Sequence, residues 1–182
     1  MRNLKRWQHL NSKIIVNHPW CKIRQDKIKL PNEQVIDDFF VHIKPDIAYV
    51  LPVTDNQEIV FVRQYRYAID DFFVELPAGS FDPEKEDPKT AALRELEEET
   101  GYVAPHLQKI ATLYDRPSKD TNKTHLFLAE KVTKSGKQKF DITEDIEVLL
   151  IHKDAILEKI YSGEISVNGT VSALLIGLNL LK

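Results

Sequence analysis

One segment, residues 76–102, constrains the fold of this chain more than any other; it reads LPAGSFDPEKEDPKTAALRELEEETGY. Its second half has the pattern of a helix with two defined ends. Asp87 is suited to cap the N-terminus, because its carboxylate can accept hydrogen bonds from free backbone N–H groups, and Pro88 suits the first helical position. Gly101 is suited to the left-handed conformation that ends many helices. We therefore expect one helix between Pro88 and Gly101.

One face of this helix is acidic. Glu95, Glu98 and Glu99 are spaced so that their Cβ atoms would lie roughly 5–6 Å apart, and like charges so placed repel. Arg94, four residues before Glu98, can compensate one carboxylate but not three. A divalent cation such as Mg²⁺ or Mn²⁺ can compensate them all, because it takes carboxylate and carbonyl oxygens as ligands. The alternative is a solvated acidic face, which is the commoner explanation for acidic runs in general.

The loop before the helix, together with the helix, resembles the Nudix box, G-x5-E-x7-R-E-U-x-E-E-x-G-U, where U is an apolar residue. From Glu86 to Tyr102 the match is complete in residue type and spacing. One departure lies at the start, where six residues instead of five separate Gly79 from Glu86. The resemblance implies hydrolysis of a nucleoside diphosphate linked to another moiety. Divalent ions would neutralise the phosphate charge, hold the attacking water and lower its pKa.

The composition limits which binding partners and which cellular compartment we expect. The chain has 182 residues, of which 42% are hydrophobic and 29% charged, with a net charge of −3, so no basic surplus favours nucleic acid as a partner. No apolar run approaches the ~20 residues of a membrane span, and the basic N-terminus lacks the apolar core of a signal peptide. The single cysteine, Cys21, excludes an intrachain disulfide. We expect a cytoplasmic protein that binds neither nucleic acid nor membranes.

The rest of the chain has mainly strand patterns. Strands over 12–16, 20–30 and 33–43 predict a small antiparallel sheet in an N-terminal region, 1–45. Further strands are expected over 47–53, 58–66, 72–78, 107–114, 124–132 and 146–152, with a polar loop over 133–145. Short and long helices are expected over 154–161 and 166–182, the second with an apolar face of Val171, Leu174, Leu175, Leu178 and Leu181. For 46–182 the resemblance implies an α/β (α+β) fold, the Nudix α/β/α sandwich with a mixed sheet.

The resemblance also implies roles for the box residues. Glu95 and Glu99 correspond to the principal metal-binding carboxylates of the family. Glu98 corresponds to a third, catalytic carboxylate that binds metal directly or through water. Ala78 stands where relatives of the ADP-ribose type provide a backbone carbonyl to a metal. Arg94 corresponds to an arginine that orients a box glutamate, and it equally fits a plain i,i+4 ion pair.

Segments outside the box resemble the ADP-ribose pyrophosphatase branch of the family. They are VRQYR (62–66), ELPAG (75–79), Pro117, HLFLAE (125–130) and the segment 163–178. The chain departs from this branch around Pro117, where Arg-Pro-Ser stands in place of the usual Ser-Pro-Gly. In this branch a glutamate in the loop before the last strand acts as a base or an extra metal ligand. Glu144 is our first candidate for it and Asp141 the second; a solvated loop carboxylate is the alternative.

Substrate-binding roles follow from the same branch. Arg66 corresponds to an arginine that contacts phosphate, for which a guanidinium fork is suited. Arg63 is the second candidate, on the opposite face of the strand, and a surface ion pair is the alternative for either. Trp20 is a candidate for stacking on the nucleobase or, alternatively, for packing against the N-terminal sheet; Phe39 is a weaker stacking candidate. Glu86 lies near the metals in relatives.

We expect hydrolysis of ADP-ribose to AMP and ribose 5-phosphate, with Mg²⁺ or Mn²⁺. One alternative is hydrolysis of another nucleotide sugar, such as GDP-mannose. Another is a non-catalytic nucleotide sensor, which the intact box glutamates disfavour. RNA decapping is disfavoured because the chain lacks a basic groove signature. The branch commonly dimerises by exchanging N-terminal strands, so residues 12–43 imply a homodimer in which Trp20 could serve the partner's site.

Overall fold

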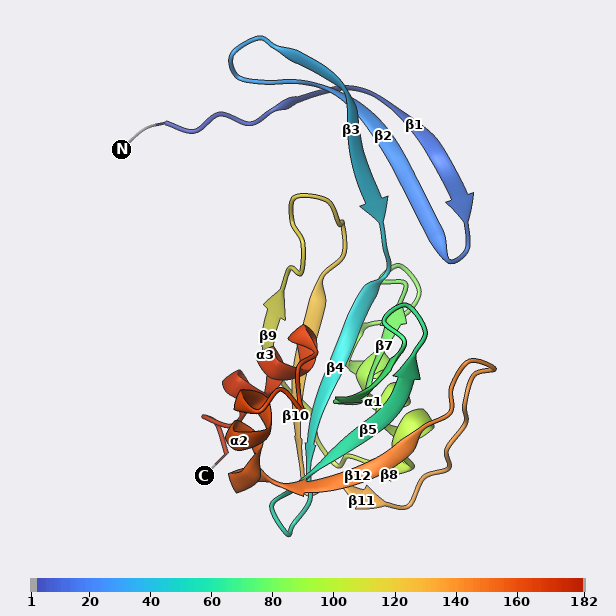
Figure 1. Ribbon diagram of the computed structural model, residues 1–182, viewed down its shortest axis with the longest axis vertical. Helices are drawn as coiled ribbons and strands as arrows, with labels where there is room; N and C mark the ends of the chain where they lie inside the picture. Colours follow the sequence, from blue (N-terminus) through green and yellow to red (C-terminus); the bar gives the residue numbers. More distant parts are fainter. Residues whose placement is uncertain (1–2, 182) are drawn as a thin grey trace. The chain divides into compact units, whose positions relative to one another are not determined.

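Figure 1 shows the computed structural model, which describes residues 3–181. Residues 1, 2 and 182, which the predicted regions 1–45 and 46–182 include, lie outside this part. The chain divides into two compact units. The first comprises the chain up to residue 45 together with 114–122, and the second comprises 46–113 together with 123 onward. Within residues 3–181 no helix is long and apolar enough to cross a membrane.

The first unit is a single antiparallel sheet with the order β1-β2-β3. Its strands are β1 (Gln8–His18), β2 (Cys21–Lys29) and β3 (Val35–Ile43). The predicted strand 12–16 is the middle of β1, which is longer because its ends pair with β2 despite their polar residues. All of β1 is exposed, including the apolar side chains of Leu10, Ile14 and Ile15. This sheet therefore has very little core of its own.

A short segment, 114–122, is fixed to β3 through Asp120. The Asp120 side chain is 3% exposed, and it accepts hydrogen bonds from Arg116 Nη2 at 3.0 Å and Lys44 Nζ at 2.8 Å. His42 Nδ1 lies 3.0 Å from the same carboxylate. The hydrogen bond from Arg116 is the first cause that holds the pKa of Asp120 well below its usual range. The sequence analysis did not anticipate this ion-pair cluster.

The second unit is built on a seven-stranded mixed sheet with the path β12-β5-β4-β10-β9. The strands are β4 (Asp46–Val53), β5 (Glu58–Arg66), β6 (Asp71–Glu75), β7 (Ala78–Phe81), β9 (Gln108–Leu113), β10 (Thr124–Glu130) and β12 (Glu147–His152). β4 and β10 are parallel, and the other pairs are antiparallel. The mixed sheet that we predicted is therefore confirmed.

Alternation along the strands divides the core between the two faces of this sheet. On one face Val50, Val60 and Phe127 pack with Leu96 of α1 (Pro88–Thr100). On the other face, Leu51, Phe61 and Leu126 pack with Ile156 of α2 (Ile156–Tyr161) and Leu174 of α3 (Asn168–Gly177). Figure 1 shows the green α1 and the red α3 on opposite sides of β4. This arrangement confirms the predicted α/β/α sandwich.

The prediction of one strand over 72–78 was wrong. The chain forms β6 and β7 with a break at Leu76 and Pro77, because proline has no N–H to donate to a sheet ladder. β4 and β5 share only the pair Val53–Ile59 and then diverge, so β6 pairs with β5 and β7 pairs with β4. Pro77 O accepts a hydrogen bond from Val50 N at 3.0 Å, which joins the break to β4.

The prediction for the C-terminal helix was wrong in its ends and at Leu175. α3 covers only Asn168–Gly177, and Leu175 is 44% exposed. Leu174 of the predicted apolar face is buried, and Val171, Leu178 and Leu181 pack against the same core. Small residues, including Gly169, Thr170 and Gly177, are buried as well. A Cβ at Gly177 would lie 2.3 Å from Leu51 Cδ2, so the helix backbone approaches the sheet directly. The apolar periodicity did not indicate this, because it weights large side chains.

Three short elements complete the second unit. They are β8 (Tyr102–Val103), β11 (Thr133–Lys134) and the 3₁₀ helix η1 (Lys153–Ala155). β11 pairs with β8, so the predicted loop 133–145 begins with a strand contact that the sequence did not indicate. η1 and α2 together form the short helical region predicted over 154–161.

Candidate active site

The ends of α1 are those that the sequence predicts. Asp87 accepts hydrogen bonds from Lys89 N at 3.0 Å and Thr90 N at 3.2 Å. Gly101 has φ 70°, in the left-handed region, and its N–H donates to Glu97 O at 2.8 Å. These caps fix where the helix begins and ends, and therefore which side chains face the sheet.

β7 brings the start of the box against the helix. Ala78 N donates a hydrogen bond to Glu99 Oε2 at 3.1 Å. The next residue, Gly79, lies so close to the helix that a Cβ there would be 1.9 Å from Glu95 Oε1. The glycine is therefore required by space, since its neighbour on α1 is a buried carboxylate. Both box glutamates are held against the backbone of β7.

Arg94 joins three carboxylates. Its Nε and Nη2 donate to the two oxygens of Glu86 at 3.1 and 3.0 Å. Its Nη1 donates to Glu95 Oε1 at 2.7 Å and to Glu98 Oε2 at 3.0 Å. The hydrogen bonds to Glu86 are the first cause that raises the pKa of Arg94. Glu86 thus reaches the box although its loop carries one extra residue.

Glu95 and Glu99 carry charge that their surroundings compensate poorly. They are 8% and 4% exposed, and burial is the first cause that raises the pKa of both carboxyl groups. The negative charges of Glu95 and Glu144 raise the pKa of Glu99 further, while Arg66 lowers it. A buried carboxylate surrounded by others is stable in its ionised form only when a positive charge is close.

Glu144 follows the box by more than forty residues in the sequence. Its negative charge is among the causes, after burial, that raise the pKa of Glu95 and Glu99. Its Oε2 accepts a hydrogen bond from Asp141 N at 2.8 Å, which closes a turn before β12. The second candidate, Asp141, enters this turn through its backbone, and its side chain is exposed.

The two arginines of β5 lie in different surroundings. Arg66 Nε and Nη2 donate to the two oxygens of Glu75 at 2.8 and 2.6 Å, and Arg66 also attracts Glu99. Arg63 pairs with Glu147 at 3.2 Å and lies over the ring of Phe72, 5.1 Å from its centroid. Arg66 therefore acts on the charge of Glu99, whereas the contacts of Arg63 are with β6 and β12.

Sequence reasoning missed Glu75, which is 5% exposed and ends β6. A signal was present, because a glutamate that interrupts the apolar run of FFVEL needs a partner if it is buried. Cross-strand pairing supplies it: β6 lies antiparallel to β5, and the guanidinium of Arg66 reaches the carboxylate.

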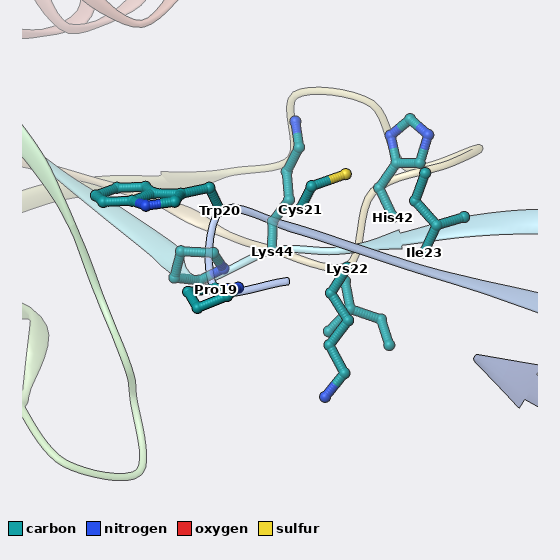
Figure 2. A pocket seen from close by; sticks show the side chains of 9 residues that line it. Pro19, Trp20, Cys21, Lys22, Ile23, His42 and Lys44 are labelled. Carbon is teal, nitrogen blue, oxygen red and sulfur yellow. The ribbon is translucent and has the colours of Figure 1, made fainter. Parts of the chain in front are cut away.

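Trp20 belongs to the first unit and is not part of a core. It is 89% exposed, in the turn between β1 and β2, so the alternative of packing against the sheet is excluded. It borders a pocket of about 170 Å³ whose lining includes Lys22, His42 and Lys44. Figure 2 shows Trp20 at one end of this pocket and His42 at the other. Phe39 packs edge-on against Trp7, with ring centroids 5.9 Å apart.

The oxygen atoms at the start of β7 and along α1 are suitable ligands for a hard divalent cation. They include carboxylate oxygens from Glu95, Glu98 and Glu99. Burial, followed by the charges of neighbouring carboxylates, raises the pKa of Glu95 and Glu99. As the side chains lie, no three His, Cys, Asp or Glu side chains within residues 3–181 are grouped to hold a metal ion. Arg94 Nη1 binds both Glu95 and Glu98.

Comparisons with known proteins agree with this geometry. The NUDIX domain model matches residues 44–163, and the model of the nucleoside diphosphate sugar hydrolase N-terminal domain matches residues 7–42. The chain is 36% identical over 141 residues to the ADP-ribose pyrophosphatase of Bacillus subtilis strain 168, covering 77% of this chain and 75% of that protein. It is 32% identical over 153 residues to the methanol dehydrogenase activator of Bacillus methanolicus, covering 84% and 82%.

A solved structure described as an ADP compounds hydrolase superposes with a TM-score of 0.88 at 19% identity, covering 100% of this chain and 97% of that one. At this identity the likeness concerns the fold alone. Together with the box residues on α1, the matches in sequence establish that the chain belongs to the Nudix family.

Proposed function

We propose that the chain hydrolyses the pyrophosphate bond of nucleoside diphosphate sugars, with ADP-ribose as its preferred substrate and AMP and ribose 5-phosphate as products. The single observation that carries the proposal is the group of buried carboxylates on α1, Glu95 and Glu99, which lie against the backbone of β7 beside Arg66. The ADP-ribose pyrophosphatase of B. subtilis, 36% identical to this chain, supports the choice of ADP-ribose.

Nudix hydrolases generally need divalent metal ions, and we propose Mg²⁺ or Mn²⁺ here. Glu95, Glu98 and Glu99 would hold the ion, with the carbonyl of Ala78 as a further ligand. When bound, the ion neutralises the charge of the two phosphates and lowers the pKa of water. A cation would also stabilise the ionised forms of Glu95 and Glu99, whose pKa is raised by burial and by neighbouring carboxylates.

The remaining groups bind and orient the substrate or move a proton. Glu144 accepts the proton of the attacking water as the new P–O bond forms and the bond from phosphorus to the bridging oxygen breaks. Two nitrogens of Arg66 are bound to Glu75, and this leaves Nη1 for a phosphate oxygen. Arg94 orients Glu95 and Glu98 through its own hydrogen bonds. Arg63 remains a second candidate for phosphate, and Glu86 acts through Arg94.

A homodimer is part of the proposal. The single-layered sheet of the first unit exposes apolar side chains along β1, and a second copy of the chain is the partner that we propose for it. Trp20 would then stack on the nucleobase in the partner's site. Size-exclusion chromatography with light scattering tests this, and a clean monomer at micromolar concentration would contradict it. A cytoplasmic location stays a prediction from the single cysteine.

The decisive experiment incubates the protein with ADP-ribose, GDP-mannose and other nucleotide sugars, with Mg²⁺ or Mn²⁺, and separates the products by chromatography. We expect AMP and ribose 5-phosphate to form fastest, and activity to disappear in EDTA. Faster hydrolysis of GDP-mannose would favour the alternative substrate. Tight binding of a nucleotide without any product would favour a sensor and contradict the proposed activity.

A further inference from the structure

A short segment, residues 136–139, lies against the C-terminal end of α1; we call it the strap. Three hydrogen bonds join it to backbone carbonyl groups at that end. Gly136 N donates to Gly101 O at 3.0 Å, and Lys139 N donates to Glu98 O at 2.9 Å. Gln138 Nε2 donates to Glu99 O at 2.9 Å. In Figure 1 the strap belongs to the orange loop between β11 and β12.

The strap supplies what the end of a helix lacks. The last four carbonyl groups of an α-helix have no partner within the helix, and its C-terminus carries a partial negative charge. Here the end is more negative than usual, because it carries the box glutamates. The strap adds positive charge, and Lys139 Nζ lies 4.0 Å from Glu98 Oε1. The contact is therefore favoured both by hydrogen bonding and by charge.

The same loop carries Glu144, five residues after Lys139. The loop leaves β11 at Lys134 and joins β12 at Glu147. Twelve residues lie between these points, and an extended chain of that length reaches about 40 Å, so the loop ends alone fix no position for Glu144. Because the strap is fixed to α1, the part of the loop that remains free begins after Lys139. It contains the turn in which Asp141 O accepts a hydrogen bond from Glu144 N at 2.9 Å.

We propose that Gln138 is a positioning residue for hydrolysis: by binding the Glu99 carbonyl it holds the strap on α1, and with it the loop that carries Glu144. Of the three hydrogen bonds, only this one is donated by a side chain. The proposal rests on the proposed function, in which Glu144 accepts the proton of the attacking water.

The test replaces Gln138 by methionine, which has nearly the same size but no N–H to donate. Removing one hydrogen bond corresponds to a decrease of about two- to tenfold in kcat, and KM should change little. Gln108→Met, in an exposed position on β9, is the matched control and should keep the wild-type kcat. An unchanged kcat in Gln138→Met would overturn the proposal.

A double-mutant cycle separates positioning from a general structural effect. If Gln138 acts through Glu144, the Gln138→Met change should have no effect on kcat in a Glu144→Gln background. An equal loss in both backgrounds would mean that Gln138 supports the fold only. A Glu144→Gln variant with wild-type kcat would also overturn the proposal, because no base would then need positioning.

Hydrogen exchange provides a readout that does not depend on turnover. In Gln138→Met the amides of Gly136, Lys139 and Glu144 should exchange about two- to tenfold faster, with α1 unchanged. Unchanged exchange at these amides would refute the role of Gln138 even if hydrolysis is observed. A wild-type protein that hydrolyses no nucleotide sugar would refute the proposed function, while exchange would still report whether Gln138 holds the strap.

Discussion

Replacing Gly79 by alanine tests whether the Glu95 carboxylate must lie where it does. The residue is not among the described glycines with positive φ, which are Gly101 and Gly163, so alanine can adopt its backbone conformation. The obstacle is space, because the new Cβ would lie 1.9 Å from Glu95 Oε1 and 2.0 Å from Glu95 Cδ. An ordinary contact is 3.4 Å, so the carboxylate must move by 1.5 Å.

The expected effect on catalysis is large and the effect on stability small. A misplacement of ~1 Å can cost on the order of 100-fold in rate, which corresponds to about 2.7 kcal/mol in the activation free energy. We therefore expect kcat/KM for ADP-ribose to fall about 100-fold in Gly79→Ala. The atoms that must move are the end of a flexible side chain, and alanine lowers the entropy of the unfolded chain by about 0.4–1 kcal/mol. The Tm should therefore change by only a few degrees.

The assay is steady-state hydrolysis of ADP-ribose at several Mg²⁺ concentrations, with the Tm of each variant measured alongside. The Mg²⁺ concentration for half-maximal activity should rise, because Glu95 is a proposed ligand. Ser80→Ala, at the next position of β7, is exposed and serves as the control. If Gly79→Ala keeps the wild-type kcat/KM and Mg²⁺ dependence, the position of Glu95 does not matter and our account of the box is wrong.

Three further substitutions test the roles of individual charged side chains. Glu99→Gln should lower kcat by orders of magnitude. Burial raises the pKa of Glu99, so the folded state favours its protonated form, and this contribution to stability is lost as pH rises through the raised pKa. Without metal, the Tm of the wild type should therefore fall relative to that of Glu99→Gln between pH 5 and pH 9. Arg94→Lys should lower kcat/KM about tenfold, because an ammonium cannot bind Glu86 through a fork and also reach the box. Asp120→Asn should lower the Tm by a few degrees; since the pKa of Asp120 is depressed, the loss should persist from pH 8 down to pH 5, and a loss that vanishes at pH 5 would contradict the ion pairs.

The sequence predicted the features that depend on local spacing. The caps of α1 followed from Asp87, Pro88 and Gly101, whose conformational preferences are intrinsic to the residue type. The strands β4 and β5 were predicted from their apolar runs, because a strand buried on both faces consists mainly of apolar residues. The box itself gave the carboxylates of α1.

Features that depend on tertiary contacts were not predictable in the same way. Pro77 is a local signal for the break between β6 and β7, but the pairing of β6 with β5 and of β7 with β4 arises because β4 and β5 diverge, which no local pattern encodes. Apart from Leu174, the buried residues of α3 are small and carry little hydrophobic signal. The fork between Arg66 and Glu75, and the cluster around Asp120, join residues on different strands and loops. The role of the strap depends on backbone carbonyl groups, which every residue has.

The break between β6 and β7 has a consequence for how the site could change in evolution or by design. Glu75, which holds Arg66, and Gly79, which faces Glu95, are only four positions apart on one continuous segment. The length of this link therefore sets the separation between the arginine and the acidic helix. An insertion or deletion within Leu76–Ala78 would change that separation for every substrate at once.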